Sequence, residues 1–292
     1  VINELKHASG RLGMGAVMGS KNLKAVAVRG TTRKLPLYNE DRAKQIVKEA
    51  SAEYKEIPNT FPKFGTMRGI RMVQDLGMLP TYNWQQGVFE DFENLAETTY
   101  MNTILKGTGT CYRCPISCKR ESEITEGPYK VRPEYGGTEY ETTASFGSIC
   151  GVNDLKPISV AHQMCQEYGI DTISPAVTIA WIMECYERGL ITKEQVDGLE
   201  MNFGNADNML ALLKKICTFE GVGKVLTQGF KASIEHFGEQ TARYAMHVKN
   251  NPLPAHDPRG KASLALAYAL SSSGPDHMEV QHKKKKKTPG GA

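Results

Sequence analysis

Apolar residues recur at helical spacing through the second half of the chain. Ile158, Ala161, Cys165 and Tyr168 predict one amphipathic helix that ends at Gly169. A second helix is expected from Ser174-Pro175, with proline at the first helical position, to about residue 188. Similar patterns predict further helices over residues 205–219, 221–237 and 262–270.

The first third of the chain has a weaker pattern. Residues 9–16 are rich in glycine and are expected to be a loop, and the alternation over residues 23–29 predicts a short strand. Residues 40–56 have helical spacing, whereas residues 60–110 are mixed. No βαβ alternation or internal repeat is visible, so we expect a mainly α fold that follows a short, glycine-rich β segment.

The charge of the 292-residue chain is concentrated at one end. The formal net charge is +4, but Lys283 to Lys287 are five consecutive lysines, and without them the balance is −1. Nucleic-acid binding needs basic residues spread over a folded face, so we exclude it and interpret residues 283–292 as a disordered tail. No apolar run is long enough for a membrane helix. The chain begins at Val1, without a methionine and without the pattern of a signal peptide, so we expect a truncated or processed start.

Seven cysteines are present, at positions 111, 114, 118, 150, 165, 185 and 217. A secreted disulfide scaffold would be smaller and denser in cysteine. A reducing, cytoplasmic location is therefore expected, with the first three cysteines serving a metal.

The sequence Cys111-Tyr-Arg-Cys114-Pro-Ile-Ser-Cys118 places three thiols within eight residues. A tight turn can direct all three sulfurs to one side, and a [4Fe–4S] cluster needs soft ligands of this kind. A zinc site would need a fourth ligand nearby. The spacing alone leaves three interpretations open: an iron–sulfur cluster, a zinc site, or unbound thiols.

A second candidate site is the acidic stretch that ends in Glu139-Tyr140-Glu141, which follows two glycines. A carboxylate beside a buried cofactor is a candidate general base, because burial is expected to raise its pKa. Taken alone, the stretch is more typical of an acidic surface loop.

Two further segments carry polar groups that suit ligand binding. The stretch Arg11-Leu-Gly13-Met-Gly15-Ala-Val-Met-Gly-Ser-Lys-Asn suits phosphate binding, although it fits neither the Walker nor the Rossmann pattern. Near the C-terminus, Ala-His-Asp-Pro-Arg-Gly is followed by an apolar helix and then by Gly-Pro-Asp-His277. A single histidine is more often structural than catalytic.

In this order, the segments resemble the tungsten-containing aldehyde:ferredoxin oxidoreductase family, from about residue 9 to about residue 282. The stretch from Arg11 resembles its pterin-contacting segment, Cys111 to Cys118 its cluster segment, and Tyr140-Glu141-Thr its active-site glutamate segment. The sequence Gln-Glu-Tyr-Gly169-Ile170-Asp171 resembles its first pterin motif, with glutamine in place of the leading aspartate.

The resemblance implies the helical second and third domains of that fold, with a remnant of the N-terminal β domain. We expect the β remnant over residues 1–36, the second domain over 37–245 and the start of the third over 246–282. The implied cofactors are a tungsten bis-pterin, with molybdenum left open, and a [4Fe–4S] cluster. Arg11, Gly13, Gly15, Gly169, Ile170 and Asp171 would contact the pterin.

The implied reaction is oxidation of an aldehyde to a carboxylic acid, with electrons leaving to ferredoxin. Glu141 would act as the base, His277 would donate to the substrate oxygen, and Tyr140 would help to orient it. The family's fourth cluster cysteine and second pterin motif find no counterpart here, so the chain is expected to be an inactive fragment. Two other functions stay open: reduction of an aromatic thioester by a related tungsten subunit, and zinc binding by a non-enzymatic helical domain. A homo-oligomer also stays open.

Overall fold

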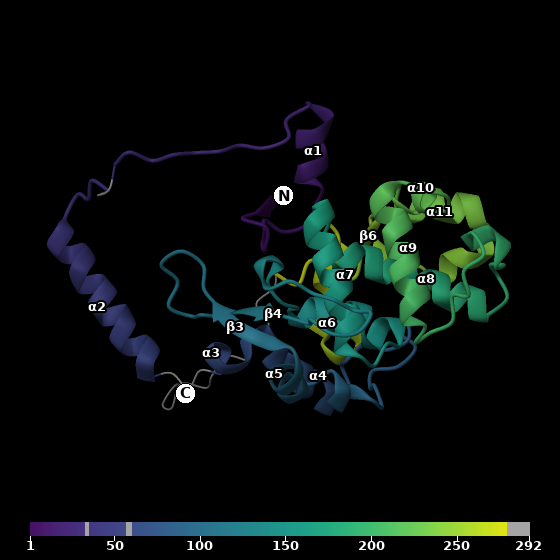
Figure 1. Cartoon of the computed structure of the whole chain (residues 1–292), viewed down its shortest axis with the longest axis horizontal. Helices are drawn as coiled ribbons and strands as arrows, with labels where there is room; N and C mark the ends of the chain where they lie inside the picture. Colours follow the sequence, from purple (N-terminus) through teal and green to yellow (C-terminus); the bar gives the residue numbers. More distant parts are fainter. Residues whose placement is uncertain (33–34, 57–59, 279–292) are drawn as a thin grey trace.

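The computed structural model describes residues 1–32, 35–56 and 60–278, and its secondary structure is mainly helical, as the sequence predicts (Figure 1). The α-helices are α1 Met14–Ser20, α2 Glu40–Glu56, α3 Phe61–Phe64, α4 Gly69–Asp75, α5 Glu97–Thr103, α6 Tyr140–Phe146, α7 Leu155–Tyr168, α8 Ile173–Glu187, α9 Ala206–Thr218, α10 Gly223–Leu226, α11 Phe230–Phe237 and α12 Ala262–Leu270. Short 3-10 helices are η1 Gly65–Arg68, η2 Phe92–Asn94, η3 Pro133–Tyr135, η4 Ser148–Cys150, η5 Glu194–Val196, η6 Glu239–Tyr244 and η7 Pro258–Gly260.

The strands form three separate antiparallel pairs. They are β1 Ile2–Asn3 with β2 His7–Ala8, β3 Leu105–Gly109 with β4 Lys119–Ser122, and β5 His247–Val248 with β6 Asn251–Pro252. The register of the longest pair sets Gly109 opposite Lys119. The loop between these two residues carries the three clustered cysteines.

Helix α8 is the centre of the core. Nearly all its residues from Ile173 to Cys185 are buried, so it is apolar on every side. Its Trp181 is fully buried, donates from Nε1 to the carbonyl of Thr241 at 3.0 Å, and packs edge-on against Phe230 and Phe237. Helices α6 and α9 pack against α8, and α7 packs against α6 and α9, which makes one helical body (Figure 1).

Helix α7 forms as its sequence predicts. The carboxylate of Asp154 caps its start by accepting from the amide of Lys156 at 2.9 Å, and its buried face includes Ile158, Ala161 and Cys165. It ends at Gly169, whose φ of 73° is a left-handed conformation that glycine adopts without strain. The chain can therefore turn sharply there into α8.

Four sequence predictions about local structure are wrong at least in part. The loop predicted over residues 9–16 ends early, because helix α1 begins at Met14. Residues 23–29 form no strand, because no other described segment pairs with them, and Val26 and Val28 stay exposed. The predicted helix over 221–237 is two helices, α10 and α11, which separate at Gly229 with a φ of 86°. Helix α8 begins at Ile173, before Ser174-Pro175, because the carboxylate of Asp171 accepts from the amides of Ile173 and Ser174.

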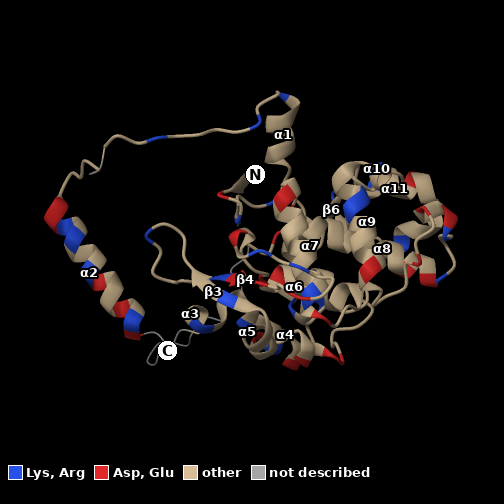
Figure 2. Ribbon diagram, viewed as in Figure 1, with Lys and Arg blue, Asp and Glu red and all other residues tan. Residues whose placement is uncertain are grey.

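The N-terminal region leaves the helical body after α1. In Figure 1 residues 23–32 lead away from α1 without regular secondary structure, and α2 lies apart from the other helices and buries none of its residues. Lys and Arg alternate with Asp and Glu along α2, as Figure 2 shows. Local ion pairs such as Lys44 with Asp41 at 3.5 Å follow from this pattern.

No helix in the described part of the chain is long and apolar enough to cross a membrane. The prediction of a lysine-rich tail over residues 283–292 lies outside the described residues. The predicted domain boundaries at residues 36 and 245 stay predictions.

Candidate active site

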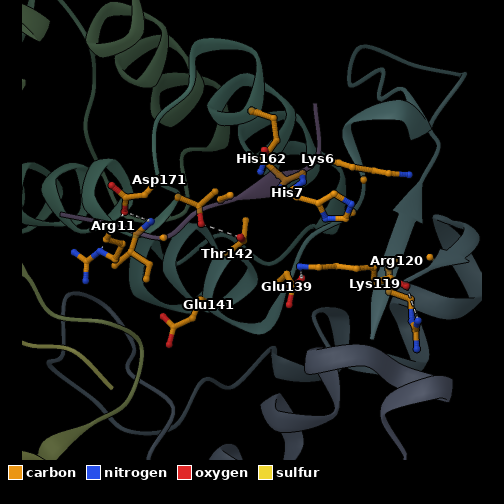
Figure 3. Close-up of a pocket in the computed structure, with 18 of the residues that line it drawn as sticks. Lys6, His7, Arg11, Lys119, Arg120, Glu139, Glu141, Thr142, His162 and Asp171 are labelled. Atoms are coloured by element: carbon orange, nitrogen blue, oxygen red, sulfur yellow. Dashed lines mark hydrogen bonds and ion pairs between the residues drawn. The ribbon is translucent and has the colours of Figure 1, made fainter. Parts of the chain in front are cut away.

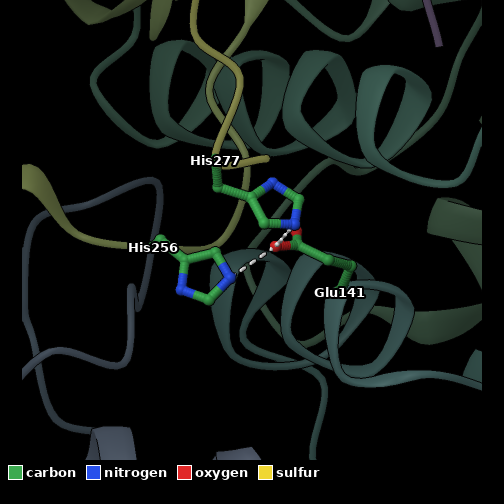
Figure 4. Close-up of side chains that lie close together, drawn as sticks. All are labelled: Glu141, His256 and His277. Atoms are coloured by element: carbon green, nitrogen blue, oxygen red, sulfur yellow. Dashed lines mark ion pairs between the residues drawn. The ribbon is translucent and has the colours of Figure 1, made fainter. Parts of the chain in front are cut away.

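Glu141, His256 and His277 meet at one point, although they come from three separate parts of the chain (Figure 4). Glu141 lies in the first turn of α6, His256 lies between β6 and η7, and His277 follows α12. The Oε1 atom of Glu141 is 3.0 Å from Nε2 of His256 and 3.6 Å from Nε2 of His277. The two imidazole rings lie 4.7 Å apart at a tilt of 32°.

The environment of Glu141 favours its charged form. Burial alone would raise the pKa of this carboxyl group, because the charged form loses its water. The hydrogen bond from His256, the charges of both histidines and the amide of Ala255 outweigh burial, and the pKa is lowered. The second oxygen, Oε2, accepts from that amide at 2.8 Å. Glu141 is therefore held in its ionised form, as a carboxylate.

Tyr140 supports the segment that carries His256. Its buried hydroxyl donates to the carbonyl of Ala255, and its ring lies 5.2 Å from the ring of His256. Burial, followed by the charge of Glu141, raises the pKa of Tyr140 well above its usual value. Tyr140 thus stays a neutral donor, and it is not among the residues that line the neighbouring cavity.

Helix α6 places these two residues because its start is fixed from several sides. Glu139 precedes the helix in an extended conformation, and the amide of Tyr140 donates to Oγ1 of Thr66 at 3.0 Å. Gly137 allows the approach, since a Cβ at this position would lie 2.2 Å from the hydroxyl of Tyr100. Tyr140 and Glu141 are consequently part of a buried helix, and the interpretation of this stretch as an acidic surface loop is wrong.

Arg11 and Asp171, which the sequence predicts as cofactor ligands, lie together. Arg11 Nε is 3.4 Å from Oδ1 of Asp171. Its Nη2 lies 2.9 Å from both the side-chain oxygen of Asn251 and the carbonyl of Pro252, and 3.2 Å from Oγ of Ser174. Arg11 therefore ties the N-terminal segment to the corner between α7 and α8.

A cavity of about 560 Å³ connects these groups. Figure 3 shows Arg11 and Asp171 on one side of it, Lys119 and Arg120 on the other, and Glu139 and Glu141 between them. His277 and Ile170 also line it. A single cavity thus joins Glu141 and His277, part of the predicted cofactor segment and the base of the cysteine loop.

A second cavity, of about 920 Å³, lies on the other side of the same corner. Gly13 and Gly15 from the N-terminal segment and Gly169 from the end of α7 line it. Ile170 and Asp171 line both cavities. All six residues predicted to contact a pterin therefore lie around one corner of the fold.

The first cavity contains buried polar atoms that have no hydrogen-bond partner within the described residues. They include Nδ1 of His7, Nδ1 of His162 and Oε1 of Gln166. Buried polar atoms are nearly always paired in folded proteins. The lining therefore fits a large polar ligand, such as a pterin, that would pair with them.

The cysteine loop lies at the end of the β3–β4 pair. Cys111 is exposed, whereas Cys114 and Cys118 are partly buried. The amide of Cys114 donates to the carbonyl of Cys111 at 2.9 Å, and Arg113 and Ser117 have positive φ angles that bend the loop. Burial, then the charges of Glu139, Cys111 and Cys114, raise the pKa of the Cys118 thiol. The three thiols therefore share one short, bent loop, as the ligands of a single cluster would.

An ion pair connects this loop to the helix that carries the carboxylate. Lys119 Nζ lies 2.6 Å from Oε1 of Glu139, whose other oxygen accepts from Thr66 at 2.8 Å. Burial alone would lower the pKa of Lys119, because it disfavours the positive charge. The negative charge and the hydrogen bond of Glu139 outweigh burial, so the pKa of Lys119 is raised. The cysteine loop and the start of α6 are thus held together.

His256 is the residue that the sequence analysis did not select. It lies in the Ala-His-Asp-Pro-Arg-Gly stretch, but nothing in that pattern separates it from a structural histidine. His256 lies two residues before η7, the helical turn that Asp257 caps. Only its contact with Glu141 in the structure identifies it as a site residue.

Two family models together match nearly the whole chain. Residues 45–290 match the family model described as aldehyde ferredoxin oxidoreductase, domains 2 & 3, and residues 1–30 match that of its N-terminal domain.

Curated relatives agree with this match. The tungsten-containing aldehyde ferredoxin oxidoreductase of Pyrococcus abyssi is 37% identical, and that of Pyrococcus horikoshii is 36% identical. In both cases the alignment covers 96% of this chain and 46% of the relative, so the chain spans about half the length of these relatives.

Among solved structures, the active site complex BamBC of benzoyl coenzyme A reductase has a TM-score of 0.67. The sequence identity is 21%, and the alignment covers 89% of this chain and 41% of the other. At that identity the likeness shows a shared fold.

Proposed function

Because this chain belongs to the aldehyde ferredoxin oxidoreductase family, a family of oxidoreductases, we propose that it forms part of an enzyme that oxidises an aldehyde to a carboxylic acid. The observation that carries the proposal is the partly buried Glu141 carboxylate, held by two histidines at the edge of a cavity that Arg11 and Asp171 also line. The relatives named above are tungsten-containing, and a tungsten-pterin would offer partners to the unpaired polar atoms of His7, His162 and Gln166 beside that cavity.

The overall reaction converts an aldehyde and water into a carboxylic acid, two protons and two electrons. The chemistry that bound groups would supply here is two-electron oxidation by a tungsten-pterin and one-electron transfer to ferredoxin by a [4Fe–4S] cluster. Arg11 and Asp171, with the backbone around Gly13, Gly15, Gly169 and Ile170, would hold the pterin. Cys111, Cys114 and Cys118 would supply three cluster ligands.

The protein's own part in the reaction is proton transfer and orientation. Glu141 would accept the proton of water or of the hydrated aldehyde at Oε1, the oxygen that faces the two histidines. His277, which lines the cavity, would donate from Nε2 to the substrate oxygen. Tyr140 would act indirectly, because its hydroxyl holds the Ala255 carbonyl beside His256.

The test is the Glu141→Gln variant of the complete polypeptide, purified without oxygen and assayed by aldehyde-dependent reduction of a viologen dye. A general base contributes about 10²–10⁴-fold to a rate, so turnover should fall in that range while the tungsten content stays unchanged. The matched control is Glu123→Gln, since Glu123 pairs with Lys106 at 2.6 Å and is not part of the cavity lining. Full activity in Glu141→Gln would remove the catalytic assignment.

The same assay addresses the other interpretations. Oxidation of reduced viologen that depends on an aromatic thioester, without aldehyde-dependent dye reduction, would select the related reductase. Zinc in place of iron and sulfide at the three cysteines would select a metal-binding domain. Since the chain spans 46% of its relatives' length, we further expect residues 1–292 alone to show no aldehyde-dependent turnover.

A further inference from the structure

The donor atoms of Glu141, His256 and His277 have the spacing of a metal coordination sphere. One nitrogen from each histidine and one carboxylate oxygen all lie within 4.8 Å of one another. The two measured contacts to Glu141 Oε1 are 3.0 and 3.6 Å. Zinc binds nitrogen and oxygen ligands at about 2.0–2.2 Å, so two ligands at a tetrahedral angle are roughly 3.3 Å apart. The two contacts to Glu141 bracket this value, and the two histidine nitrogens lie within 4.8 Å of each other.

The ligand types select the class of ion. Two imidazoles and one carboxylate suit zinc and similar divalent transition metals, whereas calcium and magnesium prefer oxygen ligands throughout. We propose that Glu141, His256 and His277 form a binding site for Zn²⁺, separate from the three cysteines. Binding there needs no tungsten and so does not depend on the function proposed above.

Neighbouring groups hold the three ligands in place. The amide of Ala255 occupies Oε2 of Glu141 at 2.8 Å and thereby directs Oε1 toward both imidazoles. The ring of Tyr140 packs against His256, and the hydroxyl of Tyr268 donates to the His256 carbonyl at 3.3 Å. Such support of ligands by surrounding groups is typical of metal sites.

The site also has room for a further ligand. Glu141 and His277 line the cavity of about 560 Å³, which leaves one side of the triad open toward it. A site with three protein ligands and an open position is the arrangement of zinc sites that bind water or a small ligand. A zinc ion here would occupy the carboxylate that the proposed oxidation uses as its base, and would therefore inhibit it.

The test uses the full 292-residue chain with Cys111, Cys114 and Cys118 all changed to Ser, so that thiolates do not compete for the ion. Co²⁺ is titrated in as a coloured probe and then displaced with Zn²⁺. The variants are Glu141→Gln, His256→Gln and His277→Gln, and the control is His236→Gln, an exposed histidine on α11. Removing a supporting group typically weakens metal binding 10–100-fold, so removing a ligand should weaken it by more than about tenfold.

Thermal unfolding provides a second measurement on the same proteins. Zn²⁺ that binds only the folded chain raises the melting temperature, and this shift should be present in the control and lost in Glu141→Gln. Circular dichroism in the absence of metal establishes that each variant is folded. Equal Co²⁺ affinity in the His256→Gln, His277→Gln and control proteins would overturn the proposal, as would no Co²⁺ binding by the control. Neither result would bear on aldehyde turnover.

Discussion

Replacing Arg11 by Ala should release the N-terminal segment from the corner between α7 and α8. Arg11 belongs to the segment that brings Gly13 and Gly15 to the second cavity. Its guanidinium group is mostly buried, with 16% of the side chain exposed, and it contacts groups from α8 and β6. Alanine keeps none of these contacts.

The size of the effect follows from the contacts. Nη2 carries two hydrogens, so the two acceptors at 2.9 Å, Asn251 Oδ1 and the Pro252 carbonyl, are its strong partners. Hydrogen bonds from a charged donor contribute about 1.5–3 kcal/mol each. A loss of about 3 kcal/mol in total corresponds to roughly a hundredfold increase in the open population of the segment. Asp171 keeps the amides of Ile173 and Ser174, so α8 itself should not unfold.

Hydrogen exchange measured by mass spectrometry is the suitable assay, because the opening is local. The amides of Ser9 and Val17, bonded to Val1 and Gly13, should exchange faster in Arg11→Ala, whereas peptides from α8 should not change. Arg11→Lys keeps the positive charge but loses the planar guanidinium group with its several N–H donors. It should therefore restore only part of the protection of these amides against exchange. Arg29→Ala, at an exposed position, is the control.

Unchanged exchange in residues 1–20 of Arg11→Ala would refute this reasoning. It would mean that the segment is held by other contacts, such as the ion pair of Lys6 with Glu121 at 2.5 Å.

Two further predictions concern the cysteine loop and the carboxylate. Cys114→Ala should abolish the iron–sulfur absorption that anaerobic reconstitution produces, because the loop supplies three of the cluster's ligands. Cys217→Ala is the control. Iron and sulfide retained in Cys114→Ala would contradict the assignment. The folded state lowers the pKa of Glu141, so its contribution to stability should be complete above the ordinary value of 4.5 and decline as the pH falls below it. Urea unfolding of the wild type and of Glu141→Gln over a pH series measures this contribution as the difference between their free energies of unfolding. A difference that grows as the pH falls would contradict the prediction.

Local patterns predicted the elements whose structure depends on local contacts. Helix α7 follows from its apolar stripe and from a glycine at its end, and the cysteine loop follows from the spacing of three thiols. The strand predicted over residues 23–29 did not form, because a strand's hydrogen bonds come from a partner elsewhere in the chain. The break at Gly229 was missed because apolar spacing continues on both sides of it.

The sequence by itself determined the mainly helical fold and, through the order of its motifs, the family. The residues alone marked the segments of Glu141 and His277 only as weak candidates, and the family resemblance gave these two residues their proposed roles. Only the tertiary structure decided that His256 joins them, and that Tyr140 serves the Ala255 carbonyl and does not face the cavity. The physical reason is that these contacts join α6 to residues more than a hundred positions later, and no local spacing encodes where such distant segments meet.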